Sequence, residues 1–470
     1  MPIESIKKAV LLVWTAGLLG CAPIEPRGFK MPAAAPEAFS RDGTEALCQR
    51  WWESLNDPNL NRLIETALEN NFSIRSAWDR LSQAEQTARI AGAGLFPQAG
   101  YSTQAQRSRT EASDIVNYSS AYSAGASISY ELDFWGRIRS LRQAAVLDAQ
   151  AAADDIQTAA ITLSAAAAKT WYQLAEAKQQ AGVIQKQLEI NEKVLAIILT
   201  QFAQGLVGAS DVLRQKQLVE SSRGQAVQNQ ETLVLLQHQL SVLCGEKPGL
   251  VWTDTPMELP EPAGLPAIGL PSDVLQRRPD VQKAYKAVQA ADLRLAAAIA
   301  DQYPSIGLFA GAETSAQQTK DLFEDWLANL AADITGPLFD AGLRKAEIAR
   351  WRAAVSQKLN EYGQTILTAL KETEDALAQE DYQRQYMRSL QEQLRLARQV
   401  YERNRDKYLQ GQMDYLRVLE SLISLQSLER QELSARRILL ERRIDLYRSI
   451  AGSWPIDRPQ QTAIVYEQFE

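Results

Sequence analysis

The sequence predicts an α+β membrane protein in which a transmembrane β-barrel, shared between chains, continues into an α-barrel of long helices. Three observations predict this fold class. Four segments alternate between apolar and polar residues, two helical stretches run for roughly seventy residues each, and the chain consists of two tandem structural repeats. Alternation alone also fits a soluble β-sandwich, so the choice between the two depends on the N-terminal segment.

The composition describes a folded chain with an acidic balance. Of 470 residues, 46% are hydrophobic and 23% are charged, and the formal net charge of -7 argues against a nucleic-acid partner. The single histidine, His238, and the lack of a nucleophile–base pair, phosphate loop or ligand cluster predict no catalytic, cofactor-binding or metal site. We therefore do not expect an enzyme.

The first twenty residues have the pattern of an export signal. Lys7 and Lys8 precede a short apolar run at 9–16, which is too brief to span a bilayer, and Leu18-Leu19-Gly20-Cys21 follows. This ending resembles a bacterial lipobox, so residues 1–20 are predicted to be a lipoprotein signal peptide and Cys21 the lipidated residue. A hydrophobic cytosolic N-terminus or a short membrane anchor is the alternative. Residues 21–49, which begin Pro/Ala-rich, are predicted to be a lipid-anchored tether.

Two further cysteines, Cys48 and Cys244, would lie in an oxidising compartment after export. They allow only one pairing. The apolar run at 240–243 beside Cys244 is typical of a packed helix end, which favours the unpaired state.

The first repeat is predicted at 50–245. A short and a longer helix lie between residues 59 and 94 and are followed by strands at about 98–109 and 121–134, with a polar loop at 110–120 between them. The second strand leads directly into a helix at about 137–204. A turn at Gly205 and Gly208 then separates that helix from another one at about 210–243.

A Pro-rich connector at 246–271 precedes the second repeat at 272–454. Strands are predicted at about 305–313 and 325–337, and a long helix at about 343–410; residues 455–470 form a C-terminal tail. Four pairs of helix- or strand-breaking residues recur at a separation of 206 or 207 residues. These pairs are Pro97 and Pro304, Gly136 and Gly342, Gly205 and Gly411, and Gly245 and Gly452. Chance similarity between alanine-rich helices would not align the breakers, so the repeat is predicted to be structural.

Four strands are too few to cross a membrane alone. A closed transmembrane barrel needs at least about eight strands, because every backbone group must be paired in lipid, so several chains must contribute to one barrel. At 1.5 Å per residue, each long helix would measure roughly 100 Å. Such helices are too polar for a globular core and too charged to span lipid, which indicates a helical tube in an aqueous space.

Several long motifs resemble, in the correct order, the TolC-like outer-membrane efflux family and its NodT-type lipoprotein branch. The motifs are Trp51-Trp52 with Asp57-Pro58-Asn59-Leu60, YELDFWGR at 130–137, LPSDVLQRRPDV at 270–281, GPLFDAG at 336–342, ETEDAL at 372–377 and IAGSW at 450–454. The resemblance runs from Arg50 to Trp454.

This resemblance implies a homotrimer with a twelve-stranded barrel, four strands per chain, and a periplasmic tunnel of twelve helices. Cys21 would be acylated and anchored in the outer membrane of a Gram-negative bacterium. The expected function is the exit duct of a tripartite efflux pump, with a periplasmic adaptor and an inner-membrane RND transporter as partners, passively conducting small toxic compounds or drugs. Alternatives are the exit channel of a protein-secretion system, a metal-efflux duct, or an anchored periplasmic coiled-coil scaffold without a pore.

The resemblance also implies that the turn in the second repeat, within 408–420, closes the tunnel entrance. Leu416 and Glu420 match the family positions that present an apolar ring and an acidic ring to the pore, with Glu where Asp is common. At the repeat offset, Arg417 corresponds to Asp211 and Glu420 to Arg214. We hypothesise that contacts among these charges hold the entrance shut; solvated surface charges are the alternative. The gate candidates are Tyr408, Asp211, Arg214, Leu416, Arg417 and Glu420.

Overall fold

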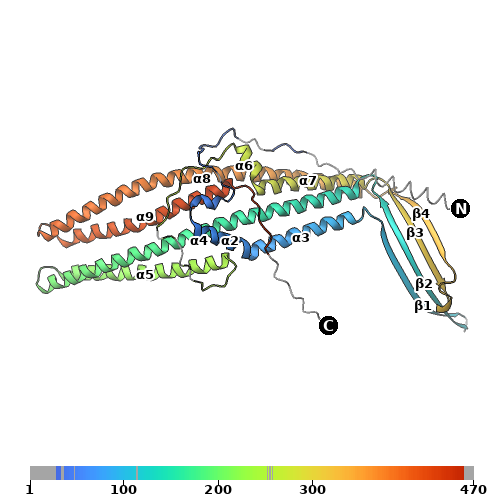
Figure 1. The fold of residues 1–470 in the computed structure, drawn as a ribbon, viewed down its shortest axis with the longest axis horizontal. Coiled ribbons are helices and arrows are strands. Elements are labelled where there is room, and N and C mark those ends of the chain that lie inside the picture. Colours follow the sequence, from blue (N-terminus) through green and yellow to red (C-terminus); the bar gives the residue numbers. More distant parts are fainter. Residues whose placement is uncertain are drawn as a thin grey trace. The chain divides into compact units, whose positions relative to one another are not determined.

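The computed structural model describes residues 28–32, 36–46, 48–112, 115–250, 252, 256 and 258–459 (Figure 1). The predicted signal peptide, Cys21 and the end of the C-terminal tail lie outside the described residues. In chain order the elements are η1 (Trp51–Leu55), α2 (Pro58–Asn70), α3 (Phe72–Ala93), β1 (Gln98–Ala112), β2 (Ile115–Leu132), α4 (Arg137–Ala203), α5 (Ala209–Leu243), α6 (Pro271–Arg277), α7 (Pro279–Ala300), β3 (Ser305–Ala316), η2 (Thr319–Asp321), β4 (Leu327–Thr335), α8 (Leu343–Leu409) and α9 (Tyr415–Ile450).

The chain forms two compact units, and each unit takes residues from both sequence repeats. The first consists of residues 79–153 and 282–364 with the N-terminal residues up to 32; the second consists of residues 33–78, 154–281 and 365–470. The four strands belong to the first unit, and the turns that end α4 and α8 belong to the second. The two repeats therefore divide the chain by sequence position, whereas the two units group residues that contact one another.

The first unit contains an antiparallel sheet with the order β1-β2-β3-β4. Its register places residues of the same character side by side: Ala126 of β2 pairs with Tyr101 of β1 and with Ala312 of β3, which in turn pairs with Ala328 of β4. One residue along, Gly125 pairs with Ser102 and Glu313. Since paired residues share a face, the sheet has one apolar and one polar face.

The hairpin of β1 and β2 is longer than the sequence predicted. Most of the segment at 110–120, predicted as a loop, is strand, and Glu111 pairs with Val116 there. The pairing of β2 with β3 begins only at Tyr122 and Ala316, so seven pairs of the hairpin extend past the part of β2 that pairs with β3. Backbone hydrogen bonds hold this extension together and do not depend on the polarity of its side chains. The polar residues there therefore predicted a loop where the chain forms strand.

The predicted long helices at 137–204 and 343–410 are α4 and α8. Each ends with the same hydrogen bonds at the repeat offset: Leu206 N–H donates to the Gln201 carbonyl at 2.9 Å, and Gln412 N–H donates to the Lys407 carbonyl at 2.9 Å. Gly205 and Gly411 have φ of 75° and 68° there. A side chain would strain this left-handed conformation, so glycine ends the helix in both repeats.

A tryptophan-rich core lies in the second unit. Trp51 and Trp52 are buried; the ring of Trp51 stacks on Tyr447 at 5.7 Å, and that of Trp52 meets Trp454 edge to face at 5.2 Å. The carboxylate of Asp57 accepts a hydrogen bond from the Trp171 indole at 2.9 Å and caps the N-terminus of α2. The first and last motifs of the chain therefore meet in one core.

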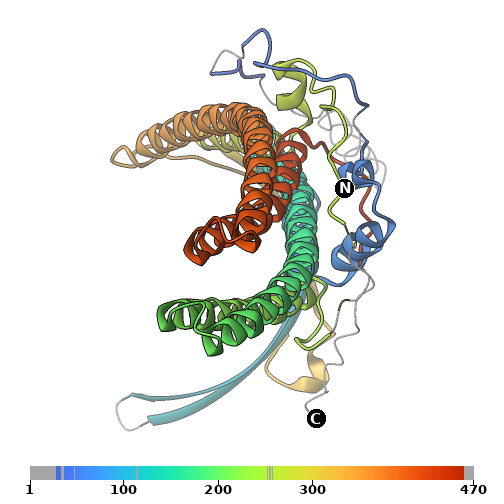
Figure 2. The same ribbon diagram turned by 90° about the vertical axis from the view of Figure 1, so that its left-hand side faces the viewer.

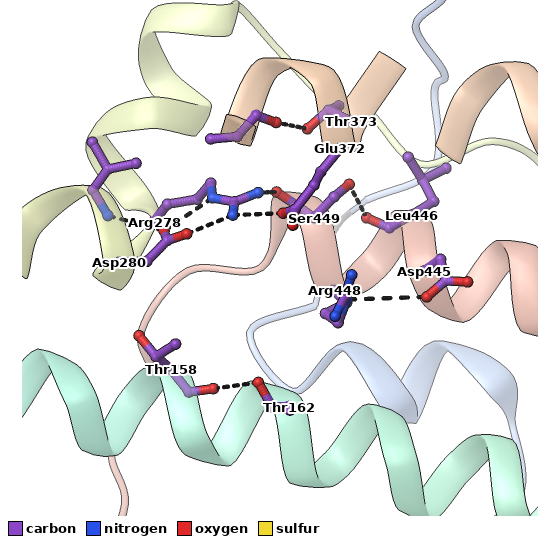
Figure 3. Close-up of polar contacts among 12 residues, drawn as sticks. Thr158, Thr162, Arg278, Asp280, Glu372, Thr373, Asp445, Leu446, Arg448 and Ser449 are labelled. Atoms are coloured by element: carbon purple, nitrogen blue, oxygen red, sulfur yellow. Dashed lines mark hydrogen bonds and ion pairs between the residues drawn. The ribbon is translucent and has the colours of Figure 1, made fainter. Parts of the chain in front are cut away.

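Arg278 joins three other motifs of the second unit (Figure 3). Its buried guanidinium bonds the carboxylates of Asp280 at 2.6 Å and Glu372 at 2.8 Å, and donates to the carbonyl of Ser449 at 2.9 Å. A buried cation requires such partners, because leaving it unpaired costs several kcal/mol. This cluster fixes the α6–α7 junction against α8 and α9.

Part of the predicted tether at 21–49 is docked. Phe39 is buried with Ile268 and Leu377, and the Glu374 carboxylate accepts the Ser40 N–H at 2.9 Å. Asp42 accepts the Ile268 N–H at 2.7 Å, and this bond lowers the pKa of that carboxyl below its usual value. The chain is therefore held from Phe39 onward, where the composition alone predicted only a tether.

Over the part of the chain that the structure describes, Cys48 is exposed, Cys244 is buried, and neither forms a disulfide. Among the helices that the structure describes, none combines the length and apolar character needed to cross a membrane.

Candidate functional site at the helix turns

The two predicted gate turns belong to the second unit, where α4 turns into α5 and α8 turns into α9 (Figure 2). An apolar cluster under the turns combines residues from both repeats. Its buried members are Ile198, Val212, Tyr415, Val418 and Leu419, with Tyr408 packed against them. This cluster links the two turns within one chain.

Two tyrosines reach from the second repeat to helices of the first. The Tyr408 hydroxyl donates to the side-chain oxygen of Gln201 at 2.6 Å, and the Tyr415 hydroxyl donates to that of Gln215. Burial raises the pKa of Tyr415, with smaller contributions from Tyr408 and Asp211, and burial also raises the pKa of Tyr408. Both phenols therefore stay protonated and act as donors over the whole physiological pH range.

The predicted ring residues lie one helical turn apart on α9. Leu416 is half-buried, whereas Glu420 is exposed. Tyr408, at the end of α8, is half-buried. Residues at this spacing share a helix face, so the Glu420 carboxylate and the exposed part of Leu416 both face away from the rest of the chain.

The four charges predicted to form a latch do not bond one another within one chain. Asp211 accepts the Gly208 N–H at 3.2 Å, which makes it a helix cap for α5, and Arg214, Arg417 and Glu420 are exposed. Over the residues that the structure describes, no ion pair joins any two of these four. The interhelix form of the latch is therefore not present here, and contacts between chains stay a prediction.

Sequence reasoning missed a buried set of hydrogen-bonding side chains between the repeats, which we call the polar ladder. The ladder comprises Gln187, Asn191, Gln215, Ser222 and Gln426. Asn191 and Gln426 exchange two amide hydrogen bonds of 3.3 and 3.0 Å, and Asn191 also donates to the Ser222 hydroxyl at 2.9 Å. Asn191 is 0% exposed and Gln426 is 4% exposed.

Further bonds extend the ladder. Gln215 donates to the carbonyl of Asn191 at 2.7 Å, and Gln187 donates to that of Gln426 at 3.1 Å and to the Glu429 carboxylate at 2.9 Å. The only sequence signal was that Gln187 and Asn191 lie four residues apart. That spacing gives a shared helix face but does not identify a partner.

Comparison with known proteins assigns the chain to a family. The family model for outer membrane efflux proteins matches residues 63–246 and 270–452. The chain belongs to the outer membrane efflux protein family. It is similar to the pyoverdine export outer membrane protein OpmQ of Pseudomonas putida, with 30% identity over 476 residues covering 95% of each chain. It is also similar to the probable outer membrane lipoprotein SilC of Salmonella typhimurium, with 26% identity covering 93% of this chain and 96% of that protein.

Solved channels of known structure share the fold of this efflux protein. The open state of the Neisseria gonorrhoeae MtrE outer membrane channel superposes with a TM-score of 0.78 and 26% identity, covering 94% of this chain and 100% of that one. The expected TolC-like fold class is thereby confirmed. The efflux protein is an exit duct of an efflux pump in the outer membrane, and members of its family are channels rather than enzymes.

Proposed function

We propose that this efflux protein acts as a homotrimer whose three sheets close a twelve-stranded barrel above a periplasmic tunnel of twelve helices. The open sheet carries this proposal. Within the described sheet, β1 pairs only with β2 and β4 only with β3, which leaves both edge strands with unpaired backbone groups beside an apolar face. In lipid such edges must be paired, and neighbouring copies supply the missing strands.

The trimer passively conducts small toxic compounds from the periplasm to the exterior. Its partners are a periplasmic adaptor and an inner-membrane RND transporter, and together they make a tripartite pump. Relatives of similar identity are named for export of pyoverdine, for antibiotic efflux and for toluene efflux, which supports small molecules as the class. Because the names differ while the identity stays at 29%, we place the choice of compound in the partners rather than in the duct.

An acyl chain on Cys21 anchors each protomer to the inner leaflet of the outer membrane. The lipobox pattern and the lipoprotein name of SilC support this anchor. Intact mass of the purified protein should correspond to an acylated chain that begins at residue 21. A mass that includes residues 1–20 would contradict the anchor.

The helix turns form the gate of the duct. Leu416 and Glu420 present an apolar ring and an acidic ring at the threefold axis, and Asp211, Arg214 and Arg417 contact neighbouring chains around them.

An acidic ring attracts cations, so Glu420→Lys should shift the channel from cation toward anion preference in reversal-potential measurements. Glu392 is an exposed carboxylate on α8, away from the turn, so Glu392→Lys is the matched control. Arg417→Glu should raise single-channel conductance, and an unchanged conductance would remove support for the latch.

Planar-bilayer recording of the acylated protein, together with its mass in detergent, tests the duct as a whole. Discrete channels formed by a species of three chains are expected. A monomer without conductance would instead support the anchored scaffold without a pore.

A further inference from the structure

The β1–β2 hairpin carries two arginines beyond the apolar band of the sheet. β2 and β3 pair over eleven residues of each strand, from Tyr122 to Leu132 on β2. A tilted strand needs about 9–11 residues to cross the hydrocarbon core, so this paired part accounts for the whole crossing. The hairpin beyond Tyr122 therefore lies past the hydrocarbon, at the level of the lipid headgroups.

The direction of this extension follows from the chain path. β1 begins shortly after α3, and β2 ends shortly before α4, so the hairpin tip is at the end of the sheet opposite the helices (Figure 1). With the helices in the periplasm, as the proposed function has them, the tip lies at the outer leaflet. Tyr118, Phe323 and Trp326 are large exposed aromatic side chains near this end, which is typical of a membrane–water interface.

The arginines are on the lipid-facing side. Side chains alternate along a strand, so Arg107 and Arg109 share a face with Ala105, which pairs with Tyr122 on the apolar side. Arg107 pairs with Ser120, and Arg109 pairs with Tyr118. The apolar face thus continues directly into a cationic patch that points outward from the sheet.

On the face that carries Arg107 and Arg109, Glu111 is the one carboxylate among the described hairpin residues. The Arg107 guanidinium lies over the Tyr118 ring, 5.5 Å from its centroid, and no carboxylate pairs with it among the described residues. Arg109 pairs with Glu111 at 2.8 Å, and both side chains are more than half exposed. Two cations therefore stand against one described carboxylate on this face of the hairpin.

We propose that Arg107 and Arg109 bind the phosphate groups of the phosphorylated glycolipid in the outer leaflet, with Tyr118 packing beside its sugars. A guanidinium matches the geometry of phosphate oxygens and forms charge-assisted bonds with them. Continuity with the lipid-facing side of the sheet favours a lipid over a soluble anion. The hairpins of a trimer would hold one such headgroup each.

Lipid retention measured by native mass spectrometry tests this site. Purified trimers are titrated with diphosphoryl lipid A, with the same lipid after removal of its phosphates, and with phosphatidylglycerol. Up to three diphosphoryl lipid A molecules should be retained per trimer, and R107Q/R109Q should lower the affinity at least about tenfold, because two charge-assisted hydrogen-bond donors to phosphate are lost. Equal retention of the lipid without phosphates, or of phosphatidylglycerol, would overturn the assignment.

Matched variants separate this site from general effects. R107K/R109K keeps the charge and should recover part of the affinity, and Glu111→Gln should raise affinity by freeing Arg109. Lys320→Gln removes a cation from the β3–β4 connection near the same end of the sheet and should change nothing. If R107Q/R109Q trimers still conduct and bind the lipid unchanged, the lipid site is refuted and the proposed duct is not. If the unmodified protein forms neither trimers nor channels, the proposed duct itself is refuted.

Discussion

At the residue scale, the two described cysteines differ in chemistry. Cys48 is exposed, whereas burial raises the pKa of the Cys244 thiol to about 11, with the charge of Glu246 as a smaller cause. Only a thiolate attacks a maleimide efficiently, so Cys244 should stay unreactive at pH 8.

Maleimide labelling of the folded, acylated protein at pH 8 should therefore modify one thiol, Cys48, and labelling after denaturation should modify two. Cys48→Ser should abolish the reaction of the folded protein. Equal labelling rates for the two thiols would show that the helix end around Cys244 opens readily.

The ion pair between Glu380 and Arg443 is the most buried one that the structure describes. Both side chains are 1% exposed, and Arg443 donates to Glu380 at 2.7 and 2.9 Å and to the carbonyl of Gly264 at 2.8 Å. Glu380→Gln leaves a buried guanidinium without its counter-charge and should cost about 3–5 kcal/mol of unfolding free energy.

A shift in the urea midpoint measures that cost. The exposed pair of Glu392 and Arg395 offers a matched control, since Glu392→Gln should cost about 0–1 kcal/mol. A similar shift in both variants would mean that burial adds nothing to the Glu380 pair.

At the scale of elements, the polar ladder should fix how α9 lies against α4. Gln426→Leu would leave the buried amide of Asn191 without one partner and should cost about 1–3 kcal/mol. The double variant N191L/Q426L removes both amides and should recover much of that loss in a double-mutant cycle.

The same double variant is expected to form channels with less uniform conductance, because an apolar contact allows more than one helix register. Bilayer recordings check this expectation. Strictly additive costs of the two substitutions would show that the amide pair is not coupled.

The elements also show which parts of the fold could be predicted from sequence. Period-two alternation predicted the apolar face of all four strands, and aligned glycines predicted the ends of α4 and α8 to within one residue. The tip of the β1–β2 hairpin was missed because its side chains do not alternate in polarity. Glu372 and Ser449, which bond Arg278, lie far away from it in sequence, as do the partners of Asn191 and Phe39, and a local pattern carries no information about them.

The candidate gate was only partly predictable. The helical spacing of Leu416 and Glu420 follows from sequence, and the family resemblance supplied their role. The opposite charges at the repeat offset did not predict that Asp211 would cap its own helix. Local hydrogen bonds of this kind compete with longer contacts and are easily overlooked.

At the scale of the whole molecule, the sheet should depend on assembly. A four-stranded sheet with an apolar face and two open edges has no stable place in a single chain. Heating in detergent should therefore dissociate the proposed trimer and remove the β-signal in circular dichroism in one transition, while much of the helical signal persists. Cross-linking at each temperature follows the dissociation, and monomers that keep their strands would contradict the shared barrel.

The matching turns of the two repeats have a consequence for the origin of the duct. A single ancestral unit with two strands and one long helix pair would need six separate copies to complete twelve strands. Fusion of two units halves the number of chains that must meet, and it frees one copy of each turn to diverge. In the proposed trimer this gives a ring with sixfold appearance in its backbone and threefold chemistry, because Asp211 serves as a helix cap while its counterpart Arg417 stays exposed.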